Sequence, residues 1–194
     1  EECRQNQLID GFVTTRSLHS SLKFKSRRHT LGLQRENPER THFIPPPLHG
    51  FTLLVSRKGF PSSTIDSMND DAAFICHKIE SNLLDSLDQR INNITGIHVE
   101  QRKIGTILKE AKRSNDDSTI ESVIGKDGKP TNSNIRLQLI IETLSFDGKV
   151  TAICERIISL EKSHMGMVNL LKDFNTLISL MQEERPEPTR RIHG

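Results

Sequence analysis

The chain has 194 residues, a length that suits one ordinary domain. Apolar residues make up 34% and aromatic residues only 4%, all of them Phe, which argues against a large layered core and favours extended helices with disordered arms. The net charge is only +2, yet residues 1–60 hold ten Lys or Arg against five Asp or Glu, and no apolar run approaches the roughly 18 residues that a membrane span needs.

Residues 1–65 are predicted to form a mostly disordered basic arm. They lack sustained hydrophobic periodicity and contain Pro38, Pro45 to Pro47 and Pro61 among many Ser, Arg and His residues. The apolar cluster Phe51 to Val55 is predicted to be a short strand or a docking peptide that cannot fold alone.

The densest basic cluster of the arm consists of Lys23, Lys25, Arg27 and Arg28. Such a cluster binds RNA phosphates through sequence-independent contacts, or serves as a nuclear import signal. A solvated basic arm without a dedicated partner is the third interpretation.

Residues 66–112 are predicted to form one amphipathic helix. Ser67 or Asn69 can cap it, and Asp70 and Asp71 suit the positive end of a helix. The stretch 113–133 is predicted to be a loop, because it contains an Asp-Gly pair at 127–128 and a helix-stopping proline at position 130.

Residues 134–185 are predicted to form a coiled-coil multimerisation helix, with a kink or break at Asp147-Gly148 and a basic tail, 186–194, after it. The prediction depends on an apolar repeat with alternating spacings of three and four, typical of helices that pair. The ten seam residues are Val150, Ile153, Ile157, Leu160, His164, Met167, Leu171, Phe174, Ile178 and Met181.

The flanks of this seam favour a trimer or tetramer over a dimer. Leu170, Leu177, Cys154 and Val168 widen the apolar face where a two-stranded coiled coil usually carries charges. His164, the one polar seam residue, is interpreted as a register-fixing gap, with a pH switch or a symmetric metal site as alternatives. An intramolecular hairpin that packs this helix on residues 70–112 would also bury the stripe.

No catalytic motif is present in the sequence. The stretch Gly125 to Lys129 lacks the spacing of a phosphate-binding loop, and no His-Glu-x-x-His pair or nucleophile elbow occurs. Cys3, Cys76 and Cys154 are far apart, so they are predicted to be reduced thiols in a cytoplasmic or nuclear protein. We therefore expect no enzyme, cofactor or metal.

The stretch SLEKSHMGMVNLLKDFNTLISLM, Ser159 to Met181, follows a polar, Ser-rich arm. This order of parts resembles the phosphoproteins of non-segmented negative-strand RNA viruses, which are polymerase cofactors with a disordered arm and a central multimerising helix bundle. The resemblance covers architecture over about half of the chain and assigns a role to no individual residue.

The leading functional hypothesis is a non-enzymatic, oligomeric coiled-coil adaptor that tethers a larger machine through multivalent contacts. Its partners would be other copies of itself and a larger protein such as a polymerase or nucleoprotein, with RNA as a further candidate and no membrane. Two alternatives stay open: a coiled-coil subunit of a cytoskeletal, trafficking or chromosomal complex, and a nucleic-acid-binding protein that acts through its basic arm.

Overall fold

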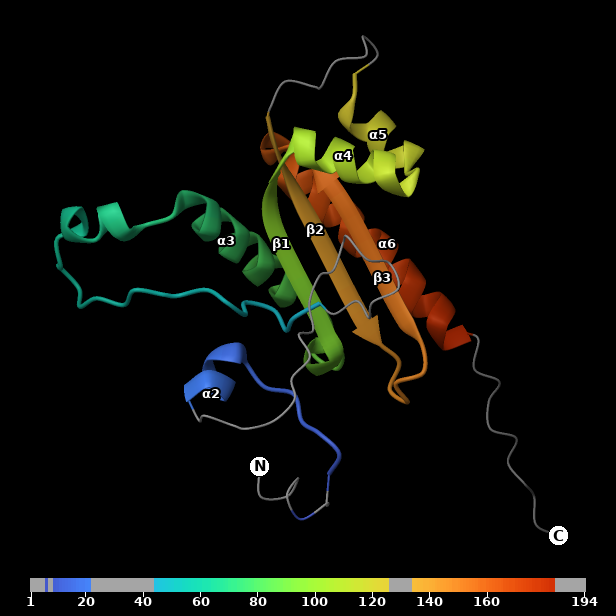
Figure 1. Cartoon of the computed structure of the whole chain (residues 1–194), viewed down its shortest axis with the longest axis horizontal. Helices are drawn as coiled ribbons and strands as arrows, with labels where there is room; N and C mark the ends of the chain where they lie inside the picture. The colour runs from blue at the N-terminus through green and yellow to red at the C-terminus, as the bar shows by residue number, and fades with distance from the viewer. Residues whose placement is uncertain (1–5, 7–8, 22–43, 126–133, 184–194) are drawn as a thin grey trace. The chain divides into compact units, whose positions relative to one another are not determined.

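The structure, a computed structural model, describes residues 6, 9–21, 44–125 and 134–183 (Figure 1). The chain divides into two compact units, Glu1–Leu31 and Gly32–Gly194. The first unit contains one described helix, α2 (Arg16–Ser21). The second contains, in order, η1 (Ser62–Thr64), η2 (Asp66–Met68), α3 (Asp71–Asp85), η3 (Asn92–Ile94), β1 (Thr95–Lys103), α4 (Ile104–Ser114), α5 (Asp117–Val123), β2 (Ile135–Leu144), β3 (Thr151–Ile158), η4 (Leu160–Lys162) and α6 (Ser163–Glu183).

The expected fold, mostly α with long coiled-coil helices, is wrong. The described part of the second unit is a mixed α/β fold, and its longest helix, α6, has 21 residues. The predicted helix 66–112 is α3, β1 and α4, whereas the predicted helix 134–185 is two strands followed by α6. The predicted loop 113–133 contains α5. In the predicted arm, Arg16–Ser21 form α2, and the described stretch 44–65 includes η1 and the buried side chain of Ile44.

The three strands form an antiparallel meander in the order β1-β2-β3. The register runs from Thr95 opposite Thr143 on one side of β2 and from Leu144 opposite Thr151 on the other. The pair Asp147-Gly148, predicted to be a kink in a helix, lies in the hairpin turn between β2 and β3. Gly148 adopts a left-handed φ of 70° there, a conformation that costs glycine least.

Strand β2 lies at the centre of the sheet and is buried on both faces from Arg136 to Ile141. Successive side chains of a strand point to opposite faces, so Leu137, Leu139 and Ile141 share one face and Gln138 and Ile140 the other. We call the first the inner face and the second the outer face.

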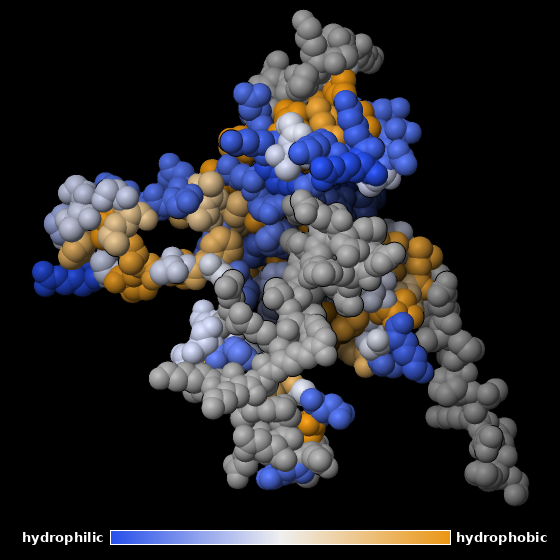
Figure 2. All heavy atoms as spheres, in the orientation of Figure 1, coloured by the Kyte–Doolittle hydropathy of each residue, from blue (hydrophilic) through white to orange (hydrophobic). Residues whose placement is uncertain are grey.

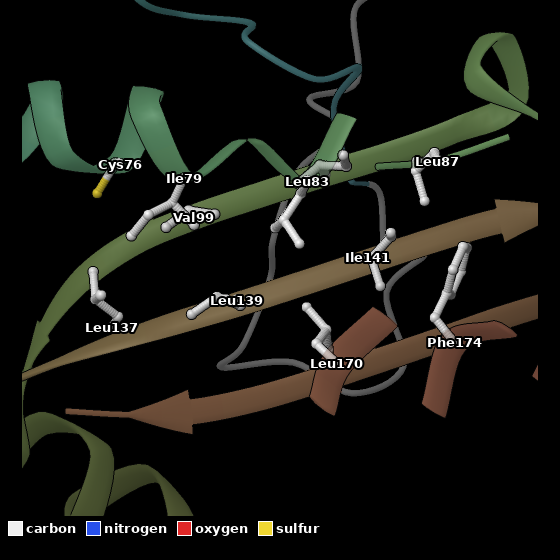
Figure 3. Packing of buried hydrophobic residues seen from close by; sticks show 11 residues of the cluster. Cys76, Ile79, Leu83, Leu87, Val99, Leu137, Leu139, Ile141, Leu170 and Phe174 are labelled. Carbon is white, nitrogen blue, oxygen red and sulfur yellow. The ribbon is translucent and has the colours of Figure 1, made fainter. Parts of the chain in front are cut away.

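The inner face packs against α3 and α6, and these contacts form the main core (Figure 3). Helix α3 contributes Ile79 and Leu83, and α6 contributes Leu170 and Phe174. Helix α3 begins where its N-cap Asp70 accepts a 3.0 Å hydrogen bond from the backbone N–H of Ala73. Both helices thus bury one apolar stripe against a sheet in the same chain, so neither stripe needs a partner helix.

Helices α4 and α5 form a second, smaller core at one end of the sheet. Ile104 and Ile107 of α4 and Val123 of α5 are buried together, and Ile157 of β3 packs against them. The register places Ile157 opposite Gln138, on the outer face, so α4 and α5 cover this face at the end where β3 finishes.

Helix α6 approaches β3 closely at Gly166. A Cβ atom at this position would lie 2.2 Å from Cδ1 of Ile158, so the glycine leaves room for the strand. Glycine normally weakens a helix by about 1 kcal/mol relative to Ala, so Gly166 is unfavourable here on helix propensity alone. Its place in the fold is to allow a helix-to-sheet contact.

Gly96 of β1 has a similar role on the outer face. A Cβ at Gly96 would lie 2.7 Å from the backbone oxygen of Ile44, whose side chain is buried. The chain around Ile44 therefore lies directly against β1, and part of the predicted arm belongs to the folded unit.

Replacing Gly96 with Ala should destabilise the protein, because the new methyl group meets a backbone atom that cannot rotate away. We expect a loss of about 1–3 kcal/mol in the free energy of unfolding, the usual range for overpacking. Urea denaturation measures this. The matched control is Gly105→Ala in α4, where nothing lies within 4 Å of the new Cβ and helix propensity favours Ala by about 1 kcal/mol. Equal effects of the two changes would contradict the close contact at Gly96.

Candidate interaction surface at an open strand edge

The sheet has two edges, and side chains of α3 close the edge at β1. Oε1 of Glu80 accepts a 2.9 Å hydrogen bond from the backbone N–H of Val99. The backbone of Gln101 hydrogen-bonds to the Cys76 thiol in the same way. Groups that would otherwise bind a further strand are therefore satisfied by α3, which protects this edge from pairing with another chain.

The second carboxylate oxygen of Glu80 holds the loop that leads into α3. Oε2 accepts a 2.8 Å hydrogen bond from the backbone N–H of Leu48. Leu48 has a φ of +62°, an uncommon conformation for a residue other than glycine, within the turn from Pro46 to His49. Three residues after Leu48, the Phe51 ring stacks edge-on against His77 of α3, with 5.2 Å between the ring centroids. One carboxylate thus joins a loop, a helix and a strand.

Burial raises the pKa of the Glu80 carboxyl, and the two N–H donors oppose this effect only in part. The side chain is almost completely buried. Burial, followed by the nearby Glu80 charge, also raises the pKa of the Cys76 thiol to about 11. Since the thiolate is the reactive form, Cys76 is suited to a structural place beside β1 and not to nucleophilic chemistry at neutral pH.

The other edge of the sheet, at β3, is open. Within the described part of the chain no further strand pairs with β3. Thr151, Ile153 and Glu155 of the outer face are exposed, and Ile153 keeps 44% of its surface in contact with solvent. An unpaired strand edge with exposed apolar side chains is a template for pairing with another extended segment.

A polar network on the outer face fixes a carboxylate beside this open edge. Arg102 of β1 donates to Gln138 of β2 at 3.1 Å and forms an ion pair with Glu110 of α4 at 2.6 Å. The amide of Gln138 in turn donates a hydrogen bond to Oε1 of Glu155 on β3. The network crosses all three strands and holds the Glu155 carboxylate in place, so the edge carries a negative charge next to Ile153.

An apolar area lies at the hairpin end of the same edge. Phe146 is 71% exposed in the hairpin, and Leu144 and Val150 on either side are exposed by about half. A small cavity of about 80 Å³ opens beneath them. Its lining consists of Ile91, Ile94, Thr143, Leu144, Ser145, Phe146, Ile178 and Met181. The hairpin thus carries exposed apolar side chains of its own, and the cavity is lined in part by Ile178 and Met181 of α6, the helix that packs on the inner face.

A cleft of about 330 Å³ lies at the opposite edge of the sheet, beside β1. Asp70, Glu100, His49 and His98 are among the residues that line it. Across residues 6, 9–21, 44–125 and 134–183, no three His, Cys, Asp or Glu side chains are grouped so as to hold a metal ion. Helices in the same part of the chain are too short or too polar to span a membrane.

The structure separates the ten seam residues. Ile153 and Ile157 lie on β3, Leu160 lies in η4, and Val150 precedes β3. Among the seam residues, those from His164 onward lie in the α-helix α6, and His164 itself is exposed. The remaining seam residues that α6 places against its own sheet are Met167, Leu171, Phe174 and Ile178, while Met181 lines the small cavity. The stripe of α6 is thus covered within the chain, beside α3 and β3.

The basic cluster Lys23, Lys25, Arg27 and Arg28 and the tail 186–194 lie outside the described residues. RNA binding and nuclear import through the cluster stay predictions.

Sequence reasoning missed both Glu80 and the open edge at β3. The signal for β3 was present, because Asp147-Gly148 separates two stretches rich in β-branched residues, the usual pattern of a β-hairpin. Glu80 gave no such signal, since a glutamate within an amphipathic helix normally lies on the solvated face.

No family model matches this chain, and neither a curated protein nor a solved structure matches it. The resemblance to viral phosphoproteins therefore stays a prediction.

The raised pKa of Glu80 predicts how stability changes with pH. The folded protein binds this proton more tightly than the unfolded chain does, so protonation favours the fold. The contribution is fully present below the ordinary glutamate pKa and is lost as the pH rises through the raised value. The free energy of unfolding of the native protein should therefore fall over this range relative to Glu80→Gln, which cannot ionise.

Chemical denaturation at a series of pH values measures this difference. Glu121→Gln, at an exposed position of α5, is the control for the loss of one carboxyl. If the free energy of unfolding of the native protein, relative to that of Glu80→Gln, stayed constant or rose with pH, burial would not be what sets the pKa of this carboxyl.

Proposed function

We propose that this protein is a non-enzymatic adaptor that binds an extended segment of a partner protein by adding it to β3 as a fourth strand. The observation that carries the proposal is the asymmetry of the sheet. The β1 edge is closed by side chains of α3, whereas the β3 edge has no described partner and carries exposed apolar side chains.

Main-chain hydrogen bonds would supply the affinity of such a complex, and alternate side chains its specificity. The eight residues of β3 offer a row of backbone donors and acceptors over about 26 Å, at the usual rise of a strand. Every second side chain of the added strand would point to the outer face, and the one opposite Ile153 would contact it. Val150 and Phe146 would extend this contact at the hairpin.

Charge favours a partner segment that is apolar and basic. The Glu155 carboxylate is held on the outer face by Gln138, one step along the same face from Ile153. A Lys or Arg opposite Glu155 forms a cross-strand pair, which contributes roughly 0.2–1 kcal/mol, whereas an acidic residue there is unfavourable. The preferred ligand is therefore an extended stretch of β-branched or aliphatic residues with a basic residue two positions away.

Selection of displayed peptides on the full chain tests this function. Selected peptides should be extended, apolar and basic, and their binding should shift the amide resonances of β3 and not those of β1. Ile153→Lys should weaken binding by roughly tenfold or more, because a charge replaces the apolar contact. Met165→Lys, at an exposed apolar position of α6, is the matched control and should bind as the native protein does. Peptides that shift only α3 and β1, or that bind Ile153→Lys unchanged, would contradict the proposal.

A further inference from the structure

The chain contains an extended apolar segment of its own that pairs with nothing in the described structure. Residues 52–57, here called the donor segment, form no helix or strand; Figure 1 draws this part of the chain as an extended trace, and all six side chains are exposed. Val55 is 93% and Leu53 66% exposed. None of the hydrogen bonds among the described residues involves the backbone of residues 52–56.

Figure 2 shows apolar side chains on the surface of this extended part of the chain, where Figure 1 draws it running away from the sheet. Three consecutive apolar residues, Leu53 to Val55, are exposed to water. This exposure is unfavourable and favours a partner that buries their side chains. The donor segment is also about as long as an average strand, roughly 20 Å for six residues.

The donor segment matches the open edge in both hydrophobicity and charge. Leu53, Val55 and Arg57 alternate on one side of an extended chain, as Thr151, Ile153 and Glu155 do on the outer face of β3. A parallel register that places Arg57 opposite Glu155 also places Val55 opposite Ile153. An apolar pair and an oppositely charged pair therefore form at the same time.

We propose that the donor segment of one copy of this protein adds to β3 of a second copy. This inference rests on the proposed function, because it names an occupant of the same edge. The donor segment leaves from the β1 side of its own unit, where Phe51 packs on His77 of α3. Its own β3 lies at the opposite edge, beyond β2. The β3 edge of a second copy can pair with the donor segment without that segment having to cross its own sheet.

The resulting contact joins two different surfaces, a donor segment and an edge. Two copies that exchange donor segments reciprocally form a closed dimer, whereas exchange in one direction forms an open chain of copies. Either arrangement would use the edge of one copy for the donor segment of another. Self-association would then compete with binding of an external partner at β3.

A charge exchange between copies tests the proposal. Arg57→Glu places like charges opposite each other when this variant associates with itself, and Glu155→Arg does the same. Each variant alone should associate roughly tenfold more weakly than the native protein, by sedimentation velocity over a concentration series. An equal mixture should recover the native affinity to within about threefold, because both contacts between unlike copies then pair opposite charges.

Two further variants keep the test decisive if Glu155→Arg does not fold, since Glu155 also accepts a hydrogen bond from Gln138. Val55→Lys and Ile153→Lys change exposed side chains on the two sides of the contact, and each should weaken association roughly tenfold. Met165→Lys should not. Thermal unfolding confirms that each variant is folded before it is compared.

Three results would overturn the inference: a native protein that stays monomeric at hundreds of micromolar, a mixture that associates no better than its two components, or association that Val55→Lys leaves unchanged. The proposed function fails by a different result. If selected peptides never contact β3, the edge is not a binding site at all. If they do contact β3 while the native protein stays monomeric, the proposed function holds, and only the proposal that a second copy occupies this edge is wrong.

Discussion

The buried carboxylate of Glu80 is the constraint on which the rest of this fold depends. Its two oxygens accept hydrogen bonds from Val99 in β1 and Leu48 in the preceding loop, so a single side chain fixes a strand, a helix and a loop. Both donors are backbone groups, and without the carboxylate each would lack this partner beside the core. An unsatisfied buried donor costs about 1–3 kcal/mol. Because α3 is fixed against β1 in this way, that edge of the sheet is closed to other chains.

The two edges of the sheet differ: the edge at β1 is covered, and the edge at β3 is not. A three-stranded sheet has two edges, and folded proteins usually cover or charge an edge that is not used. Here α3 covers β1, while β3 has only Glu155 as an exposed charge on its outer face, beside the exposed side chain of Ile153. The polar network from Arg102 through Gln138 holds that charge in place. The arrangement therefore favours one kind of partner, an extended apolar segment with a basic residue, over pairing with any available strand.

Only part of this fold was predicted from the sequence, although the sequence contains further signals for it. The amphipathic stripe of α6 was recognised, because Met167, Leu171, Phe174 and Ile178 follow helical spacing and do lie on one side of a helix. The stripe was wrongly continued through Ile153 and Ile157, since spacings of three and four also arise by chance in a short strand rich in Ile. The available signal for a strand was the alternation of apolar and polar residues from Ile135 to Leu139, followed by the β-branched pair Ile140 and Ile141. Two features depend on tertiary contacts that no local pattern contains. One is that a sheet covers the α6 stripe, and the other is that Glu80 pairs with distant backbone groups.

Hydrogen–deuterium exchange of the free protein, at a dilution where it is monomeric, tests whether the two edges of the sheet differ in this way. We expect slow exchange of the Val99 and Gln101 amides, whose outward N–H groups are bonded to α3. The β3 amides that point away from β2 should exchange at least about a hundredfold faster, because no described group of the protein accepts a hydrogen bond from them. Equal protection of both edges would contradict an open β3 edge, since β3 would then already be covered and could not receive another strand.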